Sequence, residues 1–313
     1  MTDSKATYCI YTDKEVPPEK GNWDHVYPLS LGGTNTFVVW SDFEKNSVIG
    51  SEVDGALAND PLLELALRDS GVRGHRKTEH VPRWRKGAMD DGRPIQVTWG
   101  KQKITIWDAR ANRNLEEVEV AGRKMTATFK IGKHTALRFI AKAALGGGYF
   151  VYGDVFRRAV NCNDLRELIF LDVEKLRQRG TLEHSGILVC DRFHADSLGS
   201  GGAVLYRALC EGMRRSLFIA IPHHQSIAFH VGIVGMYIGS MIVPADTNNF
   251  PSDGDHDLGH AIVLGPGQME RLSLRALVLD FQAAFGTAVA KAASAQKPSR
   301  WRAFLNWIIS KLR

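Results

Sequence analysis

The sequence stretch that decides the fold is Trp23-Asp24-His25-Val26-Tyr27-Pro28-Leu29-Ser30-Leu31-Gly32-Gly33-Thr34-Asn35, closed by Ser41-Asp42-Phe43-Glu44-Lys45-Asn46-Ser47-Val48-Ile49-Gly50. It gathers a carboxylate, an imidazole and side-chain amides within a short segment that is rich in turn residues. Carboxylate and amide oxygens suit a hard divalent cation, and an imidazole can take a proton near neutral pH. Because neighbouring residues of a strand point to opposite faces, a tight turn would be needed to bring Asp24 and His25 to one site.

The residues around this stretch predict the order strand, loop, strand, helix. Residues 7–12 and 36–40 are rich in β-branched and aromatic residues, which is typical of strands. Ser41 or Asp42 can cap a helix over residues 43–53. A second helix is expected over residues 61–70, because Pro61 stands in its first turn and Gly71 follows its end.

At these residues the sequence resembles the HNH (ββα-metal) endonucleases. The resemblance spans residues 9–61 and is carried by Asp24-His25, the loop at residues 28–33, Asn35 and Asn46-x-x-x-Gly50. Residues 51–61 also resemble the continuation found in a bacterial subgroup whose N-terminal HNH motif is followed by a larger domain. The expected fold class is therefore α+β, with a ββα-metal module and a mixed α+β C-terminal domain.

The resemblance implies a role for each matching residue. His25 would be the general base that activates water, and Asn35 would orient it. Asp24 and Asn46 would hold one Mg²⁺ or Mn²⁺ ion per chain. The implied activity is hydrolysis of DNA phosphodiester bonds.

One feature of the resembling family is missing. Many of its members carry two Cys-x-x-Cys pairs that bind a structural zinc. Here Cys9 stands at the first pair with Thr12 as its partner, and Asp42 and Lys45 stand at the second. One cysteine cannot make a tetrahedral thiolate site, so we expect no structural zinc. Packing of Trp23, Trp40 and Phe43 is expected to hold the loop instead.

Composition places the chain among globular proteins. It has 313 residues, 44% of them hydrophobic and 24% charged, which allows two domains. Its four cysteines form no motif, which favours free thiols and a cytoplasmic location. The N-terminus lacks the apolar run of a signal peptide, and no segment approaches 18 apolar residues, so we expect no membrane insertion.

Charge is distributed unevenly. Residues 1–60 hold four lysines, no arginine and ten acids, a net charge of −6, and since the whole chain is +6, residues 61–313 carry +12. The C-terminal part could thus attract DNA, although solvated surfaces alone could also produce this asymmetry. Residues 73–87 are the most basic segment, and the candidate DNA-binding residues are Arg73, Arg76, Lys77, Arg83, Trp84, Arg85 and Lys86.

Domain boundaries are placed around this basic segment. We expect a nuclease module at residues 1–72, a basic linker at 73–92, and an α+β domain for DNA recognition or regulation at 93–313. A plain solvated linker remains the alternative reading of the basic segment.

Periodicity predicts the elements of the larger domain. A helix is expected over residues 133–145, with Arg138 and Lys142 opposite its apolar face and Gly146–Gly148 at its end. A basic amphipathic helix is expected at residues 299–313. The remaining predictions are strands at 95–99, 104–107, 118–120, 125–129, 187–189 and 217–221, a hairpin at 226–231 and 235–243, and helices at 153–161, 164–178 and 269–292.

The leading hypothesis is a metal-dependent DNA endonuclease of restriction or anti-phage defence. One active site cuts one strand, so a homodimer is expected. Two alternatives stay open. The first is a nuclease effector whose C-terminal domain senses a small-molecule activator. The second is a non-catalytic nucleic-acid-binding protein with a degenerate HNH fold.

Overall fold

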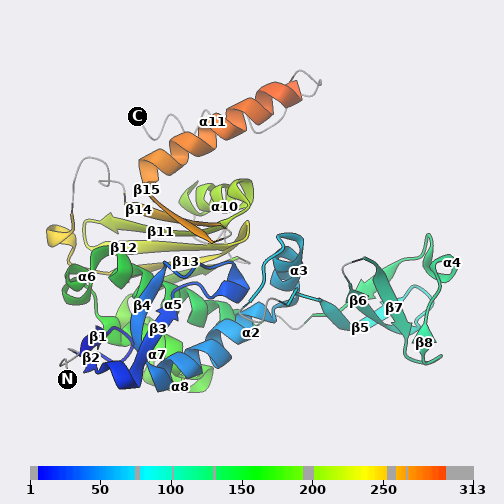
Figure 1. Cartoon of the computed structure of the whole chain (residues 1–313), viewed down its shortest axis with the longest axis horizontal. Helices are drawn as coiled ribbons and strands as arrows, with labels where there is room; N and C mark the ends of the chain where they lie inside the picture. Colours follow the sequence, from blue (N-terminus) through cyan, green and yellow to red (C-terminus); the bar gives the residue numbers. More distant parts are fainter. Residues whose placement is uncertain are drawn as a thin grey trace.

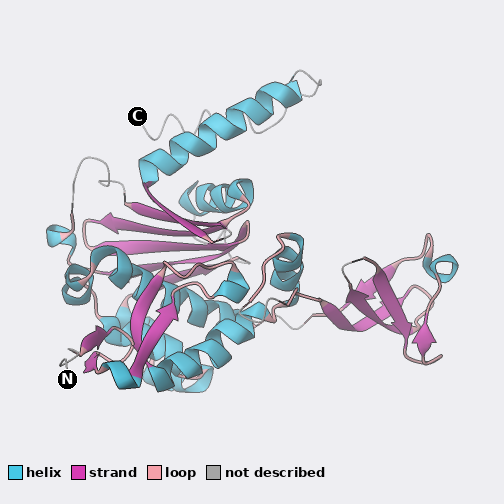
Figure 2. Ribbon diagram, viewed as in Figure 1, coloured by secondary structure: helices cyan, strands magenta, loops and turns pink. Residues whose placement is uncertain are grey.

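The computed structural model describes residues 6–74, 78–100, 102–129, 132–192, 201–251, 259–265 and 267–293 (Figure 1 and Figure 2). Helices account for 41% and strands for 33%, which confirms the α+β class. Within these ranges, no helix is long and apolar enough to cross a membrane. The helix expected at residues 299–313 lies outside the described residues.

The largest element is a six-stranded antiparallel sheet with the order β10-β13-β12-β11-β14-β15. The predicted hairpin is confirmed as β12 and β13, which turn at Val234 and Gly235, both with positive φ. The predicted helix at 269–292 is wrong in its first turn, because those residues pair with β14 as a strand. The strands are β10 (Leu188–Asp191), β11 (Ser216–His223), β12 (Ser226–Ile233), β13 (Met236–Pro244), β14 (His260–Gly265) and β15 (Gln268–Ser273).

Helices cover both faces of this sheet. Side chains of β11 alternate: Phe218 and Ala220 pack in the cluster that contains α5, whereas Leu217 and Ile219 pack with α10 and α11. Because both faces are covered, the central strands are mostly apolar, with Ser216, His230 and Ser240 as buried polar exceptions. The covering helices are α5 (Lys133–Tyr152), α10 (Gly201–Met213) and α11 (Leu274–Ala293), and α6 (Asp154–Ala159), α7 (Cys162–Phe170), α8 (Val173–Arg179) and α9 (Thr181–Ser185) follow α5.

The N-terminal segment packs into the same core. The ring centroid of Phe37 lies 4.9 Å from that of Phe150 and 5.7 Å from that of Phe218. The stretch predicted as a module over residues 1–72 therefore shares one hydrophobic core with α5 and the sheet. Its elements are β1 (Thr7–Cys9), β2 (Lys14–Val16), β3 (Gly21–His25), β4 (Val38–Asp42), α1 (Phe43–Val48), the π-helical η3 (Ile49–Asp54), α2 (Gly55–Ala58) and α3 (Pro61–Asp69).

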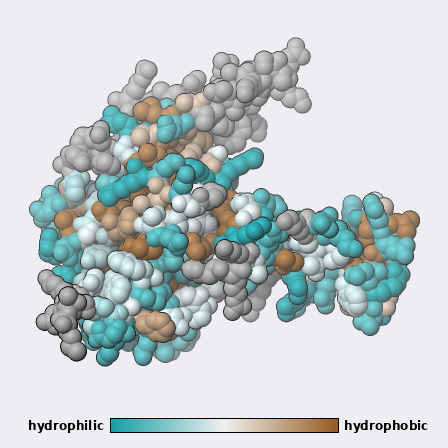
Figure 3. Space-filling view, viewed as in Figure 1, coloured by the Kyte–Doolittle hydropathy of each residue, from teal (hydrophilic) through white to brown (hydrophobic). Residues whose placement is uncertain are grey.

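A small lobe with its own core lies between α3 and α5 in the chain. Figure 3 shows it projecting from the main body, and its sheet has the order β8-β7-β6-β5-β9. Met89, Ile95, Val97 and Ile106 form its buried centre. The elements are β5 (Arg83–Met89), β6 (Pro94–Trp99), β7 (Ile104–Asp108), β8 (Arg113–Asn114), α4 (Glu117–Val120) and β9 (Met125–Ala127).

The structure of this lobe differs from two expectations drawn from the sequence. Strand β5 begins at Arg83, inside the segment expected to be a linker, because it pairs with both β6 and β9. The strand predicted at residues 118–120 is wrong: these residues form α4, whose first turn is closed by reciprocal bonds between Glu116 and Glu119.

The expected end of the long helix is also wrong. Helix α5 continues through Gly146–Gly148 to Tyr152 instead of stopping at the glycines. A Cβ atom at Gly147 would lie 2.5 Å from the Phe218 ring, and one at Gly148 would lie 2.6 Å from the Phe156 ring. The glycines therefore let the sheet and α6 approach the helix closely, which is a tertiary requirement.

We expect Gly147→Ala to lower the free energy of unfolding by about 1–3 kcal/mol, because the added methyl group overpacks the contact with Phe218. Gly50→Ala is the matched control: it lies in η3, where an added Cβ meets nothing within 4 Å. Urea denaturation of both variants measures the difference. Equal stabilities would contradict the proposed role of the glycine run.

Candidate functional site

The candidate site is built on the β3–β4 hairpin and the helix that follows it, beside α5 (Figure 1). The strands pair antiparallel, with His25 opposite Val38 and Asp24 opposite Val39. Asp42 caps α1, since its carboxylate accepts a bond of 3.0 Å from the Lys45 amide. The order strand, loop, strand, helix therefore occurs in the structure.

His25 and Asn35 lie together at the end of this hairpin where the loop of residues 26–37 joins the two strands. The imidazole Nε2 is 2.9 Å from Asn35 Oδ1 across the loop. An amide oxygen only accepts, so the contact is a hydrogen bond when Nε2 carries the proton. In that tautomer, Nδ1 holds the lone pair that a general base needs. The structure thus brings together the two residues expected to act as base and orienter.

Asp24 points into the protein interior. Its residue is 3% exposed, and its Oδ2 accepts a bond of 2.8 Å from the Tyr11 hydroxyl. Strand β3 runs through Asp24 and His25 with regular pairing, so no tight turn brings the two side chains to one side. The expectation of a turn at this point is wrong, because the hairpin ladder fixes the alternation.

Asn46 on α1 meets a residue that the sequence did not single out. Its Nδ2 donates a bond of 2.8 Å to Asn22 Oδ1. By strand alternation, Asn22 and Asp24 share one face of β3. No described residue donates a hydrogen bond to Asn46 Oδ1. Asn22, Asp24 and Asn46 therefore supply oxygen atoms to the same side of the hairpin.

These donors fit a hard divalent cation by their chemistry. Among the described residues, no group of three or more His, Cys, Asp or Glu side chains could hold a metal ion. An ion here would depend on one carboxylate and amide oxygens. Mg²⁺ is commonly held by one or two carboxylates while it keeps several waters, and Mn²⁺ prefers similar ligands. Asp24 and Asn46 carry oxygen atoms of these kinds, and Asn46 bonds Asn22.

A fully buried lysine stands beside Asp24. Lys142 on α5 donates bonds of 2.7 Å to Asp54 Oδ2 and to the main-chain oxygen of His25, and its Nζ lies 3.5 Å from Asp24 Oδ2. The sequence analysis placed Lys142 on the side of the helix opposite its apolar face. The expectation that this side is polar and open is wrong, because that side of α5 is also buried at Lys142. The ammonium group therefore joins α5 to the strand that carries His25.

The electrostatics of this cluster are strongly perturbed. Burial raises the pKa of Asp54 to about 7, although Lys142 opposes the shift, and Asp54 Oδ1 has no hydrogen-bond partner among the described residues. Burial lowers the pKa of Lys142, but attraction to Asp24 and Asp54 outweighs this and raises it overall. Lys142 therefore stays charged and balances one of the two carboxylates.

Sequence reasoning missed Lys142, Tyr11, Asp54 and Asn22. Lys142 carried one usable signal: it is the only charged residue between Phe139 and Tyr152, in a run that is otherwise apolar or small. A single charge in such a run indicates a buried partner. Tyr11 and Asn22 carried no comparable signal, because their role depends on residues brought near by folding.

The fold places the residues of the basic segment (73–87) in different surroundings. Arg83, Arg85 and Lys86 are exposed on β5, and Trp84 points to the other side, with its ring centroid 4.9 Å from those of Trp99 and Phe129. Trp84 thus belongs to the lobe's own packing instead of stacking beside the arginines. Arg73 bonds Glu79 at 2.7 Å. Arg76 and Lys77 lie outside the described residues.

The place of the missing cysteine pairs is packed differently from our expectation. The Cys9 thiol is buried and accepts a bond of 3.3 Å from the Asp42 amide. Trp40 packs inward and bonds the Val16 oxygen, but Trp23 is 59% exposed and Phe43 is 62% exposed. Of the three aromatic residues expected to hold the loop, only Trp40 packs against the core.

We expect Lys142→Met to lower the free energy of unfolding by about 3–5 kcal/mol, because Asp24 and Asp54 would stay buried without a cation. Lys175→Met is the control, since that side chain on α8 is 64% exposed. Adding Asp54→Asn to Lys142→Met should restore part of the loss by removing one buried charge. A loss no larger than that of Lys175→Met in urea denaturation would contradict this account.

Comparisons with known proteins found no relative of this chain. No protein-family model, curated protein or solved structure matches the chain.

Proposed function

We propose that this protein is a metal-dependent DNA endonuclease of restriction or anti-phage defence. The observation that carries the proposal is the 2.9 Å contact between His25 Nε2 and Asn35 Oδ1 at the loop end of a hairpin. The helix that follows this hairpin carries Asn46, which bonds Asn22 on β3. These are the residues through which the sequence resembles HNH endonucleases.

His25 acts as the general base in this proposal. Asn35 fixes the ring orientation and favours the tautomer with its proton on Nε2. Nδ1 then takes a proton from the water that attacks the phosphorus atom. A positioned base of this kind contributes roughly 10²–10⁴ to the rate.

Asp24 and Asn46, with Asn22 beside them, are the residues that would hold Mg²⁺ or Mn²⁺. The ion when bound would offset negative charge that develops on the phosphate and on the leaving oxygen. Lys142 and Tyr11 hold the Asp24 carboxylate in one orientation, at 3.5 Å and 2.8 Å from Oδ2. Their contacts position this ligand before substrate arrives.

Charge supports DNA as the substrate. Arg83, Arg85 and Lys86 are exposed on the small lobe, and residues 61–313 carry the positive charge of the chain. Since one site cuts one strand, double-strand cleavage calls for two copies. The dimer would be contradicted by two results together. Light scattering would show a single copy of the protein on DNA, and the cleavage assay would show both strands cut in a single encounter.

We expect His25→Ala to reduce nicking of supercoiled plasmid at least about 100-fold, and EDTA to abolish nicking by the unaltered protein. His224→Ala removes an exposed histidine in the turn after β11 and is the matched control. Asn35→Ala should slow cleavage less than His25→Ala, because the base remains but is no longer held. Full cleavage by His25→Ala would remove the assignment.

A second candidate is a non-catalytic nucleic-acid-binding protein. It is favoured by the 3% exposure of Asp24 and by the contacts of Tyr11 and Lys142 with its Oδ2, which compete with a metal ion. The same plasmid assay separates the two candidates. A gel shift without cleavage at any tested Mg²⁺ or Mn²⁺ concentration supports binding alone.

A further inference from the structure

Trp23 is a large aromatic residue that lies exposed on the strand that carries His25. It is 59% exposed, although the sequence led us to expect that its ring would pack against the loop. A single exposed apolar side chain is common on protein surfaces. The argument for a function of Trp23 therefore depends on where its ring lies and on what holds it there.

Trp23 and His25 share one face of β3. Side chains alternate along a strand, and the ladder between β3 and β4 is regular from Gly21 to His25. Asp24 lies between the two residues, points inward and is 3% exposed. The face with Trp23 and His25 is therefore the one that a molecule in solution can reach. Two residues of a strand span about 6.8 Å, which is comparable to the distance between a phosphate and the base of the same nucleotide.

The Trp23 ring is supported by Trp40, its neighbour across the hairpin. The two ring centroids are 5.3 Å apart, and the ring planes make an angle of 79°. Trp40 is itself fixed, because its Nε1 donates to the Val16 oxygen at 3.2 Å and a Cβ atom at Gly21 would overlap its ring. An edge-to-face pair is favourable and does not cover both faces of either ring. Trp23 is thus a positioned aromatic surface that stays open to a third ring.

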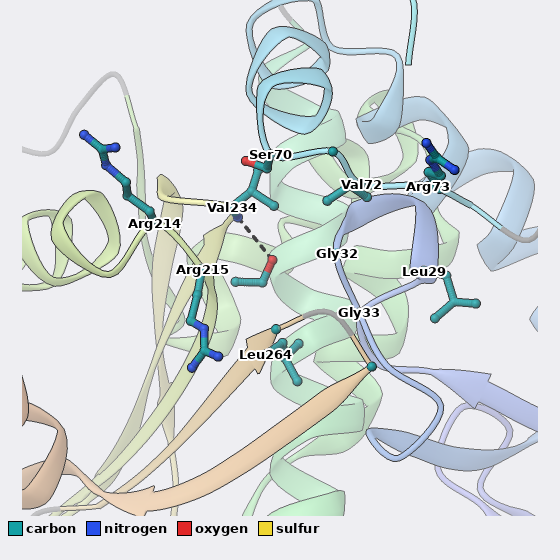
Figure 4. A pocket seen from close by; sticks show the side chains of 14 residues that line it. Leu29, Gly32, Gly33, Ser70, Val72, Arg73, Arg214, Arg215, Val234 and Leu264 are labelled. Carbon is teal, nitrogen blue, oxygen red and sulfur yellow. Dashed lines mark hydrogen bonds between the residues drawn. The ribbon is translucent and has the colours of Figure 1, made fainter. Parts of the chain in front are cut away.

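The loop between β3 and β4 holds the other end of this face. Ser216 Oγ donates to the Leu31 oxygen at 3.2 Å and accepts from the Val234 amide at 3.1 Å, the bond dashed in Figure 4. These bonds anchor the loop to the six-stranded sheet. The same loop supplies Asn35, which contacts His25 at 2.9 Å. The imidazole and the aromatic ring are therefore both held in place before a substrate arrives.

A nucleobase is the chemical group that suits this surface. Every base has a flat π face, and stacking on an aromatic side chain binds it without reading the sequence. In a duplex each base is already stacked between its neighbours, so a side chain reaches a base face only where the strand is unpaired. An open aromatic ring beside the proposed general base therefore favours single-stranded DNA over a continuous duplex.

We propose that Trp23 stacks on an unpaired base of single-stranded DNA and places the adjoining phosphate beside His25. Stacking of this kind selects single-stranded DNA, or an unpaired segment within a duplex, as the substrate. The position of the cleaved bond rests on the proposed function. Binding of the base by Trp23 does not depend on cleavage and can be measured by itself.

Fluorescence anisotropy of a labelled single-stranded oligothymidylate with the full chain tests the binding, with EDTA present to prevent cleavage. We expect Trp23→Ala to bind at least about fivefold more weakly, because the stacking contact with a base is lost. Trp23→Phe keeps an aromatic ring and should retain most of the affinity. Phe43→Ala is the matched control, since it removes an aromatic side chain that is 62% exposed at the start of α1, and it should bind normally.

An abasic strand of the same length separates stacking from other effects of the substitution. Trp23→Ala should bind this strand as well as the unaltered protein does, because the lost contact is the one with the base. Equal weakening toward the abasic strand and the oligothymidylate would overturn the proposal. It would also be overturned if Trp23→Ala bound the oligothymidylate normally, if the unaltered protein did not bind it, or if a duplex of the same length bound as tightly.

Cleavage of the oligothymidylate in Mg²⁺ or Mn²⁺ tests the part that rests on the proposed function. Trp23→Ala should raise the KM for this strand at least about fivefold, and Phe43→Ala should leave it unchanged. An unchanged KM in Trp23→Ala would separate Trp23 from the cleaved bond and overturn this part. A protein that cuts no DNA removes the nuclease proposal and leaves the anisotropy result intact.

Discussion

One buried ammonium group ties the centre of this molecule together. Lys142 has no exposed surface, and its Nζ bonds Asp54 and the His25 main-chain oxygen while lying 3.5 Å from Asp24. An unpaired charge in the interior is very unfavourable, so α5, β3 and the end of η3 must keep these positions together. The strand that carries His25 is thus held by charge compensation as well as by the hairpin ladder.

Close packing of α5 extends this constraint to the sheet. Gly147 and Gly148 leave room for the Phe218 and Phe156 rings, so one helix contacts the hairpin and the sheet together. The loop after His25 is anchored to β11 by the Tyr27 and Ser216 hydroxyls. The candidate site and the sheet therefore form one packed body.

The small lobe is held together by a hydrophobic core of its own. Met89, Ile95, Val97 and Ile106 give it a core separate from the main one, and Trp84 adds to it. Its basic side chains Arg83 and Arg85 face solvent on β5. Among the described residues, the buried cluster of the lobe is separate from that of the main body, so the lobe can present positive charge without affecting the packing around Lys142.

The sequence by itself determined the local structure. Asp42 and Asp60 cap α1 and α3 through bonds that reach two or three residues, and the hairpin of β12 and β13 turns where glycine permits it. The resemblance to HNH endonucleases also implied that Asn35 orients His25. The tertiary structure alone decided which groups pair with Lys142 and the continuation of α5 through its glycines. The physical reason is distance: the acceptors of Lys142 lie 88 and 117 residues away, beyond any local pattern.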